Sequence, residues 1–496
     1  MGKRILAFDF GASSGRAMLG TFDGEKISLT EIHRFSNDPV MVGKTFYWDA
    51  LRLFFEIKQG ILKAKQNGGF DSIGINTWGV DFGLLGKDGQ LIENPVNYRD
   101  KRTEGMMSYS EKFITNTDLY LETGNQLMEI NTAFQLLSLC KNRPHILDNA
   151  ETLLMMPDLF NYFLTGEKYT ELSIASTTQL LDPKTKDWNV EVMKKLGIPQ
   201  RLFAPIIKSG AVVGMLSEEI CEELGVERVP VIAVCEHDTQ NAVMATPAKD
   251  KDFIFLSCGT WSLFGTEREV AVFSETTCRL NLTNEVGFDG TVNLLNNIIG
   301  LWLIQESRRQ WAREGVEYSF SQLTKEASEA VALKCFVNPD YADFTPAGNI
   351  PERIREYCKN TGQEIPQKVG EIVRCIYESL AMKYRYTIEL LSEATGNDYD
   401  TIHIVGGGIK DKLLCQTVAD ICQKKVVAGP IEATVLGNIA IQLISHGEIE
   451  DISHARKIIR NSEETVTYKP TGDSSEINEA YDRFLEIMFV KETALN

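Results

Sequence analysis

Three short stretches of this chain could carry out chemistry, and each follows a run of apolar residues. Gly11–Arg16 offers consecutive backbone N–H groups, small side chains and one cation, so it could wrap a phosphate. Cys258–Ser262 is a second turn that is open to the same two readings. Gly406–Gly408, before a predicted helix, would let a flat adenine or ribose approach the backbone. Each stretch alone also fits an ordinary tight turn. Together they favour nucleotide binding.

Two carboxylates stand at the ends of apolar runs. Asp238, in Glu236-His237-Asp238-Thr239, could accept a proton from a substrate hydroxyl, or it could cap the helix that follows. Asp9 could hold Mg²⁺ through water, or it could be an ordinary residue at a strand end. Metal ligation by His237 is poorly supported, because the chain has no HExxH motif.

Alternating strands and helices must position these residues, and their order predicts an α/β fold. The strand–turn–strand pattern at residues 3–22 is repeated at residues 253–267, which suggests two related lobes that divide near Pro247. Trp302 and Gln305 are expected in a helix over residues 297–312, with Gln305 able to turn toward a cleft. The other predicted strands cover 26–35, 72–76, 229–235, 402–405 and 425–428, and the other helices 51–62, 240–246, 369–391 and the segment from 409 through 419.

Length and charge restrict the possible functions. The chain has 496 residues, 43% hydrophobic, which suits about two to four domains. Its 51 Lys+Arg and 69 Asp+Glu give a net charge of −18, so nucleic acid and anionic membranes are unexpected partners. No apolar run reaches the roughly 18 residues of a membrane span, and the N-terminus does not read as a signal peptide. The ten cysteines form no CxxC pair. We therefore expect a cytoplasmic protein with reduced thiols.

Longer motifs in the same order along nearly the whole chain resemble the FGGY carbohydrate kinases, within the actin–hexokinase–Hsp70 ATPase superfamily. These motifs are DFGASSGRAML, SIGINTWGVDFGLL, NYRDKRT, MMPDLFNYFLTG, CEHDT, SCGTWSL, NNIIGLWLIQ, HIVGGG and GPIEATVLGNI. The resemblance implies two actin-like (ribonuclease H-like) lobes, each a mixed sheet flanked by helices, with a cleft between them. Residues 1–246 would form the N-terminal lobe, with the sugar site and the first phosphate turn. Residues 247–496 would form the C-terminal lobe, with the second phosphate turn and the adenosine site.

The resemblance also implies ATP- and Mg²⁺-dependent phosphorylation of a ketose, with the 1-hydroxyl of L-rhamnulose as the favoured acceptor. Asp238 would be the base. Trp78 and Asp81 would shape the pocket around Gly79. The ATP residues would be Ala12, Ser13, Ser14, Gly15, Arg16, Thr260, Gln305 and Gly407, and the sugar residues Gly79, His237, Asp238, Thr239 and Asn297.

Two departures distinguish this chain from much of that family. It has Phe134-Gln135-Leu136-Leu137 where many members have Lys-Leu-x-Trp, and Cys235 and Glu236 where many have glycine. Both favour the branch that acts on L-rhamnulose over glycerol or xylulose kinases. L-Fuculose and L-xylulose remain alternative substrates. A non-kinase actin-like ATPase and a catalytically silent sugar sensor are further alternatives. We expect a monomer or weak homodimer.

Members of the family that resemble this chain carry cysteines at the positions of Cys358 and Cys375, and a disulfide has been assigned to them. A cytosolic location argues against the bond, because thiols there are kept reduced. We therefore expect the two sulfurs to lie close together without activity depending on a bond between them.

Overall fold

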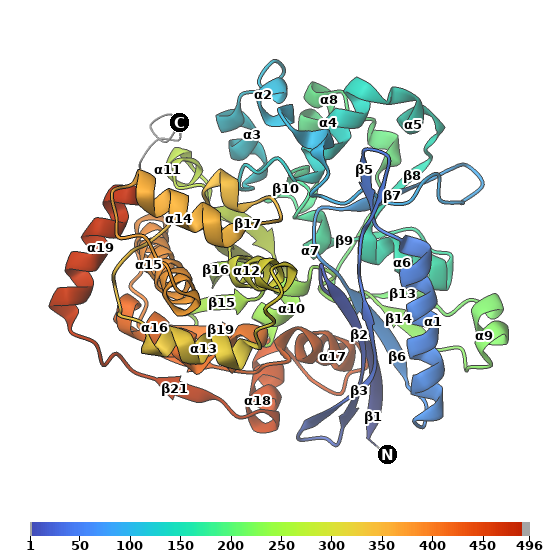
Figure 1. Ribbon diagram of the computed structural model, residues 1–496. Helices are drawn as coiled ribbons and strands as arrows, with labels where there is room; N and C mark the ends of the chain where they lie inside the picture. Colours follow the sequence, from blue (N-terminus) through green and yellow to red (C-terminus); the bar gives the residue numbers. More distant parts are fainter. Residues whose placement is uncertain (1, 489–496) are drawn as a thin grey trace. The chain divides into compact units, whose positions relative to one another are not determined.

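The computed structural model describes residues 2–488, which form two compact units (Figure 1). Unit 1 contains the chain up to Pro247, Glu267–Leu294 and Ala433–Glu463, and unit 2 contains the remainder. The prediction placed all of residues 247–496 in one lobe. In the structure the first division between the units lies after Pro247, and two later segments belong to unit 1; one of them contains α17 (Ala433–Ser445), which packs on its sheet. The roles given to the lobes remain predictions.

Unit 1 is built on a six-stranded mixed sheet in the order β13-β14-β6-β1-β2-β3. Strands β1, β2 and β3 are antiparallel neighbours, whereas β6 runs parallel to β1 and to β14. The antiparallel pairs arise from short turns in the first forty residues. The strand bounds are β1 Lys3–Phe10, β2 Ser14–Phe22, β3 Ile27–Ser36, β6 Ser72–Asn76, β13 Val212–Met215 and β14 Pro230–Ile232.

Alternating side chains of β1 point to opposite faces of this sheet, and a helix covers each face. On one face, Phe8 packs against α1 (Ala50–Gln66), where Gly60 allows close approach. On the other face lies α17, whose Gln442 donates to the carbonyl of Leu6. Figure 1 shows α1 and α17 on the two sides of the sheet. The ends of β1 and β6 are thereby held in a rigid layer.

In unit 2, the strands follow the order β18-β16-β15-β19-β20-β21. An antiparallel hairpin, β15–β16, lies beside the parallel strands β19 and β20, as β1–β2 lies beside β6 in unit 1. The bounds are β15 Ile254–Cys258, β16 Trp261–Arg268, β18 Val292–Ile299, β19 Thr401–Val405, β20 Lys425–Ala428 and β21 Val466–Tyr468. The helices used below are α12 Trp302–Arg313, α13 Phe320–Glu329, α14 Ile350–Asn360, α15 Val369–Thr395 and α16 Lys412–Cys422.

These observations confirm the predicted α/β class, with mixed sheets flanked by helices. The strands predicted at 72–76 and 425–428 have the predicted bounds. The strand predicted at 229–235 is shorter, Pro230–Ile232, because the following residues leave the sheet to form the loop before α10 (Asp238–Met244). Within residues 2–488, none of the helices combines the length and apolar character needed to span a bilayer.

Candidate active site

Asp9 lies near the end of β1, facing polar residues from both neighbouring strands. The register pairs it with Arg16 of β2 and Asn76 of β6. Its Oδ2 accepts from Arg16 Nη2 at 2.7 Å, and its Oδ1 accepts from Asn76 Nδ2 at 2.9 Å. Asn438 of α17 donates to Asn76 Oδ1 at 2.8 Å, which fixes the orientation of that amide. Both carboxylate oxygens of Asp9 are therefore held in position by hydrogen bonds.

The candidate phosphate turn follows directly. Gly11 N–H donates to the carbonyl of Ser14 at 2.9 Å, and Asn37 pins the turn by donating to the carbonyls of Gly11 and Ser13. Ser14, Gly15 and Arg16 already belong to β2, so only the residues before them form the tip. An added Cβ at Gly15 would meet the Phe35 ring. A larger side chain at position 15 would therefore first disturb the packing around Phe35, before any effect on a phosphate bound at the turn.

Asp238 is the first residue of α10, and His237, not Asp238, occupies the cap position. Asp238 N–H donates to Thr77 O at 2.9 Å, which ties the loop to the end of β6. Thr239 N–H donates to Asp238 Oδ1 at 2.7 Å, while the Asp238 side chain stays 32% exposed. Loss of hydration raises the pKa of Asp238 to about 6, opposed by His237 and reinforced by the Asp9 charge. The carboxylate is positioned, accessible and ionised at neutral pH.

His237 is fixed by an acid that the sequence did not reveal. Its Nδ1 lies 3.1 Å from Glu285 Oε2, and its Nε2 lies 3.5 Å from Asp238 Oδ1. Gln240 Nε2 donates to the same Glu285 oxygen at 2.8 Å. Burial disfavours the imidazolium, yet the neighbouring carboxylates, Glu285 first and then Asp238 and Glu171, together raise the pKa of His237. Glu285 is 48 positions from His237 in sequence, with no motif around it, so only the fold brings them together.

Two buried carboxyl groups that the sequence did not reveal, Asp158 and Glu171, support the loop that carries Glu236. Glu171 Oε2 accepts from Glu236 N–H at 3.1 Å, and Glu171 N–H donates to Asp158 Oδ1 at 2.9 Å. Asn161 donates to Glu236 Oε1 at 2.6 Å. Loss of hydration raises the pKa of Asp158 to about 8 and, with repulsion from Asp158, that of Glu236 well above its usual range. The cluster therefore keeps a proton at neutral pH.

Gly79 lies in a bend that two partners define. An added Cβ there would press on the side chain of Thr177, whose hydroxyl accepts from Val80 N–H at 3.1 Å. Asp81, only 1% exposed, accepts from the indole N–H groups of Trp48 and Trp78 at 2.6 and 3.0 Å. Burial raises the pKa of Asp81 to about 6. Asp81 therefore orients the two indole rings.

The departure at Phe134–Leu137 belongs to this bend. It lies in α4 (Thr132–Asn142), and Gln135 donates to Asp81 Oδ1 at 3.0 Å while accepting from Arg102 at 2.5 Å. In this chain the unusual glutamine thus helps to hold the Asp81 carboxylate.

Within unit 2, Thr260 lies in the turn between β15 and β16. Its hydroxyl donates to Gln305 Oε1 at 3.2 Å, and its carbonyl accepts from the N–H groups of Gly300 and Trp302. Gln305 lies in α12, as predicted, but the helix begins at Trp302. Asn297 was expected in that helix and instead lies in strand β18, because the strand continues to Ile299 before the turn at Gly300.

The three glycines after β19 differ in what surrounds them. Gly406 has φ = +88°, and an added Cβ at Gly408 would collide with the Cys258 side chain. At Gly407, an added Cβ would have nothing within 4 Å. Gly406 and Gly408 therefore allow the end of β19 to pack closely against Cys258 of β15, while Gly407 faces open space. The structure thus gathers Thr260 with Gln305 in unit 2, and Asp9, His237, Asp238 and Thr239 in unit 1.

Comparison with known proteins defines the family. Residues 4–245 match the N-terminal domain of the "FGGY family of carbohydrate kinases", and residues 254–446 match its C-terminal domain. The chain belongs to this family. It is 41% identical over 485 residues to a rhamnulokinase of Bacteroides thetaiotaomicron, covering 98% of this chain and 99% of the relative. It is 38% identical to a rhamnulokinase of Enterococcus faecalis, covering 98% of each.

Solved structures share the fold at lower sequence identity. A xylulose kinase from Lactobacillus acidophilus aligns with a TM-score of 0.81 at 17% identity, covering 98% of this chain and 97% of that one. A Plasmodium falciparum glycerol kinase, solved with ADP, aligns with a TM-score of 0.79 at 18% identity, covering 99% of each. These likenesses support the fold class. The family makes this protein an ATP-using carbohydrate kinase.

Proposed function

We propose that this kinase transfers the γ-phosphoryl group of ATP to the 1-hydroxyl of L-rhamnulose, giving L-rhamnulose 1-phosphate and ADP. The assignment of L-rhamnulose as the substrate is supported by the 41% identity to a rhamnulokinase along nearly the whole of both chains. The solved structures do not discriminate among sugars, since their identities lie near 17%.

Asp238 is the proposed general base. Its carboxylate is 32% exposed and is oriented by Thr239 N–H, so it can meet a sugar hydroxyl while keeping its direction. A pKa of about 6 keeps it ionised at neutral pH yet basic enough to take the hydroxyl proton as the new O–P bond forms. Phosphoryl transfer through a loose transition state depends on such positioning more than on strong basicity. His237, Thr239, Gly79 and Asn297 are the other proposed sugar residues.

The proposed nucleotide residues are Ala12–Arg16 in unit 1 and Thr260, Gln305 and Gly407 in unit 2. The open space at Gly407, between two glycines that crowd Cys258, fits an adenosine approaching the backbone. The small residues at the tip after β1 fit a phosphate.

Mg²⁺ is proposed at Asp9 through a water molecule. Both Asp9 oxygens already accept hydrogen bonds from Arg16 and Asn76, which fits an outer-sphere role better than direct ligation. Mg²⁺ keeps several waters when it binds phosphates, and bound there it would neutralise charge on the transferred group. The ATP requirement supports a cytoplasmic location. A monomer or weak homodimer is the oligomeric state to be tested by light scattering.

The test is to incubate the protein with ATP, Mg²⁺ and L-rhamnulose, and to measure ADP together with the ³¹P and ¹³C spectra of the product. We expect equal amounts of ADP and a phosphate ester at C1. ADP formed without a sugar phosphate would instead indicate the non-kinase ATPase. A product only with L-fuculose or L-xylulose would assign the kinase to another ketose.

A further inference from the structure

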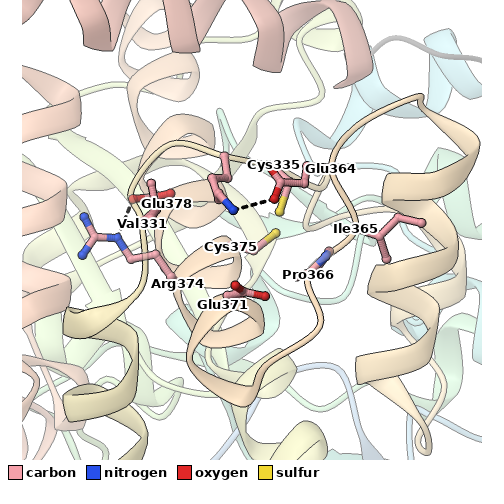
Figure 2. A pocket seen from close by; sticks show the side chains of 10 residues that line it. Val331, Cys335, Glu364, Ile365, Pro366, Glu371, Arg374, Cys375 and Glu378 are labelled. Carbon is pink, nitrogen blue, oxygen red and sulfur yellow. Dashed lines mark hydrogen bonds and ion pairs between the residues drawn. The ribbon is translucent and has the colours of Figure 1, made fainter.

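Three cysteines from separate segments of unit 2 converge beneath a small surface hollow. Cys335 lies in the segment between α13 and α14, Cys358 in α14 and Cys375 in α15. Their three sulfurs lie within 4.8 Å of one another, and the residues are 5%, 0% and 2% exposed. Figure 2 shows the Cys335 and Cys375 sulfurs pointing toward each other. Cys335, which completes the set, was not expected from the sequence.

The backbone around these sulfurs is fixed by side chains of the neighbouring elements. Phe336 N–H donates to Gln363 Oε1 at 2.8 Å, and Val337 N–H donates to Ser379 Oγ at 2.9 Å. Ser379 Oγ in turn donates to the carbonyl of Cys375 at 2.6 Å. The segment that carries Cys335 is therefore fastened to α15, and the three sulfurs are pre-organised.

Two cations stand beside the cluster, each already paired with an acid. Lys334 Nζ lies 2.5 Å from Glu364 Oε1, and Arg374 Nε lies 2.5 Å from Glu378 Oε1.

We propose that Cys335, Cys358 and Cys375 bind a single thiophilic d¹⁰ metal ion, Zn²⁺ or Cu⁺, through their three sulfurs. Three thiolates at a Zn–S distance of about 2.3 Å place the sulfurs about 4 Å apart, so the observed cluster needs only a small contraction. Soft thiolate ligands select these ions over Mg²⁺. Binding releases the thiol protons of the three cysteines to water. Within residues 2–488 this is the one group of three or more His, Cys, Asp or Glu residues that is so closely gathered.

The hollow supplies access and a place for a fourth ligand. It has room for about one water molecule, and its lining includes Cys335 and Cys375 (Figure 2). Glu364 and Glu371 also line it. A water molecule bound here would complete a tetrahedral zinc site.

A disulfide between Cys358 and Cys375 is the competing use of the same sulfurs. It would engage two of them and leave Cys335 as a buried thiol beside the bond. All ten cysteines are free in the structure of residues 2–488. Metal binding is the use that engages every sulfur in the cluster, and it would fasten α14, α15 and the Cys335 segment to one another.

The experiment titrates the full chain, reduced with a phosphine and freed of metal, with Zn²⁺ against a chromophoric chelator, and with Cd²⁺ as an ultraviolet probe of thiolate ligation. We expect one equivalent of each ion, a sulfur-to-cadmium band and a higher Tm with Zn²⁺. Cys335→Ala should weaken Zn²⁺ binding by about 100-fold or more, because even outer-shell partners cost 10–100-fold. Cys422→Ala, at a buried cysteine of α16, is the matched control and should bind as the wild type does.

Circular dichroism of the metal-free variants checks that they fold, and Cys335→Ser replaces any alanine variant that does not. Equal Zn²⁺ affinity in wild type and Cys335→Ala would overturn the proposal. Wild-type protein that binds no zinc after full reduction, but shows eight free thiols before it, would also overturn it and would assign the pair Cys358–Cys375 to a disulfide.

Discussion

The two hairpins that open the sheets, β1–β2 in unit 1 and β15–β16 in unit 2, share a topology but not a chemistry. Each is an apolar strand, a turn of small residues and an antiparallel return beside a parallel strand. The strand end in unit 1 is charged, with Asp9 paired to Arg16 at 2.7 Å. The turn in unit 2 is neutral, and Thr260 meets Gln305 at 3.2 Å.

This difference indicates where each unit can contribute to phosphoryl transfer. At the charged end, burial raises the pKa of Asp238 to about 6 and the Asp9 charge adds to this shift, so we propose that proton removal takes place in unit 1. At the neutral end, hydrogen bonds and close glycine packing fix a surface without adding charge. We expect a change at Asp238 of unit 1 to act on turnover and changes at Thr260 or Gly407 of unit 2 to act on ATP binding.

The largest expected effect comes from Asp238→Asn, which keeps the shape of the side chain but removes the base. We expect kcat to fall by about 10²–10⁴ while L-rhamnulose binding persists. Steady-state kinetics and calorimetric binding of the sugar measure the two quantities separately. A variant that keeps more than a tenth of wild-type turnover would remove Asp238 from the mechanism.

A smaller effect, on stability, separates two adjacent glycines of unit 2. Gly408→Ala drives a methyl group against Cys258, and overpacking of this kind costs about 1–3 kcal/mol of unfolding free energy. Gly407→Ala adds the same methyl group to open space and is the matched control. Its stability should stay near that of wild type while its KM for ATP rises. Equal denaturation midpoints for the two variants would contradict this reading of the glycines.

The pH dependence tests the charged end. A pKa of about 6 means that protonation, which removes the base, becomes dominant below pH 6. We expect kcat/KM to fall about tenfold per pH unit on that side and to be level above it. Asp238→Asn should lack this limb, which separates Asp238 from the titration of ATP itself. A wild-type profile that is level between pH 5 and 8 would argue against the assignment.

The smallest effect is expected at Thr260. Thr260→Val removes the hydroxyl that donates to Gln305, and a neutral hydrogen bond contributes about 1 kcal/mol, so KM for ATP should rise about fivefold. Thr260→Ser keeps the hydroxyl and should behave as wild type. If kcat falls instead while KM is unchanged, the division of roles between the two hairpins is wrong.

The sequence allowed the sheets to be predicted where apolar runs were short and sharply bounded. Strand β6, Ser72–Asn76, is an example. The sequence analysis placed Asn297 in a helix, which is wrong. The apolar run there continues to Ile299 and turns at Gly300, and such a run is also compatible with the start of the next helix. Local pattern cannot separate a short buried strand from helix when both neighbours are apolar.

Of the candidate site, local motifs revealed Asp238 but not the groups that hold its loop. Glu285, Asp158 and Glu171 are distant in sequence and lie in no recognisable motif. They act as buried acids whose partners only the tertiary structure supplies. The same holds for Cys335, whose neighbours Cys358 and Cys375 were predicted to be close to each other.

The measurement that tests the central claim most directly is the comparison of kcat/KM for L-rhamnulose, L-fuculose, L-xylulose, D-xylulose and glycerol under one ADP-release assay. Buried polar groups left unpaired by the wrong sugar can change such ratios by factors of about 10⁴. The account predicts the highest value for L-rhamnulose. A higher value for D-xylulose or glycerol would contradict it; the structural neighbours include a xylulose kinase and a glycerol kinase.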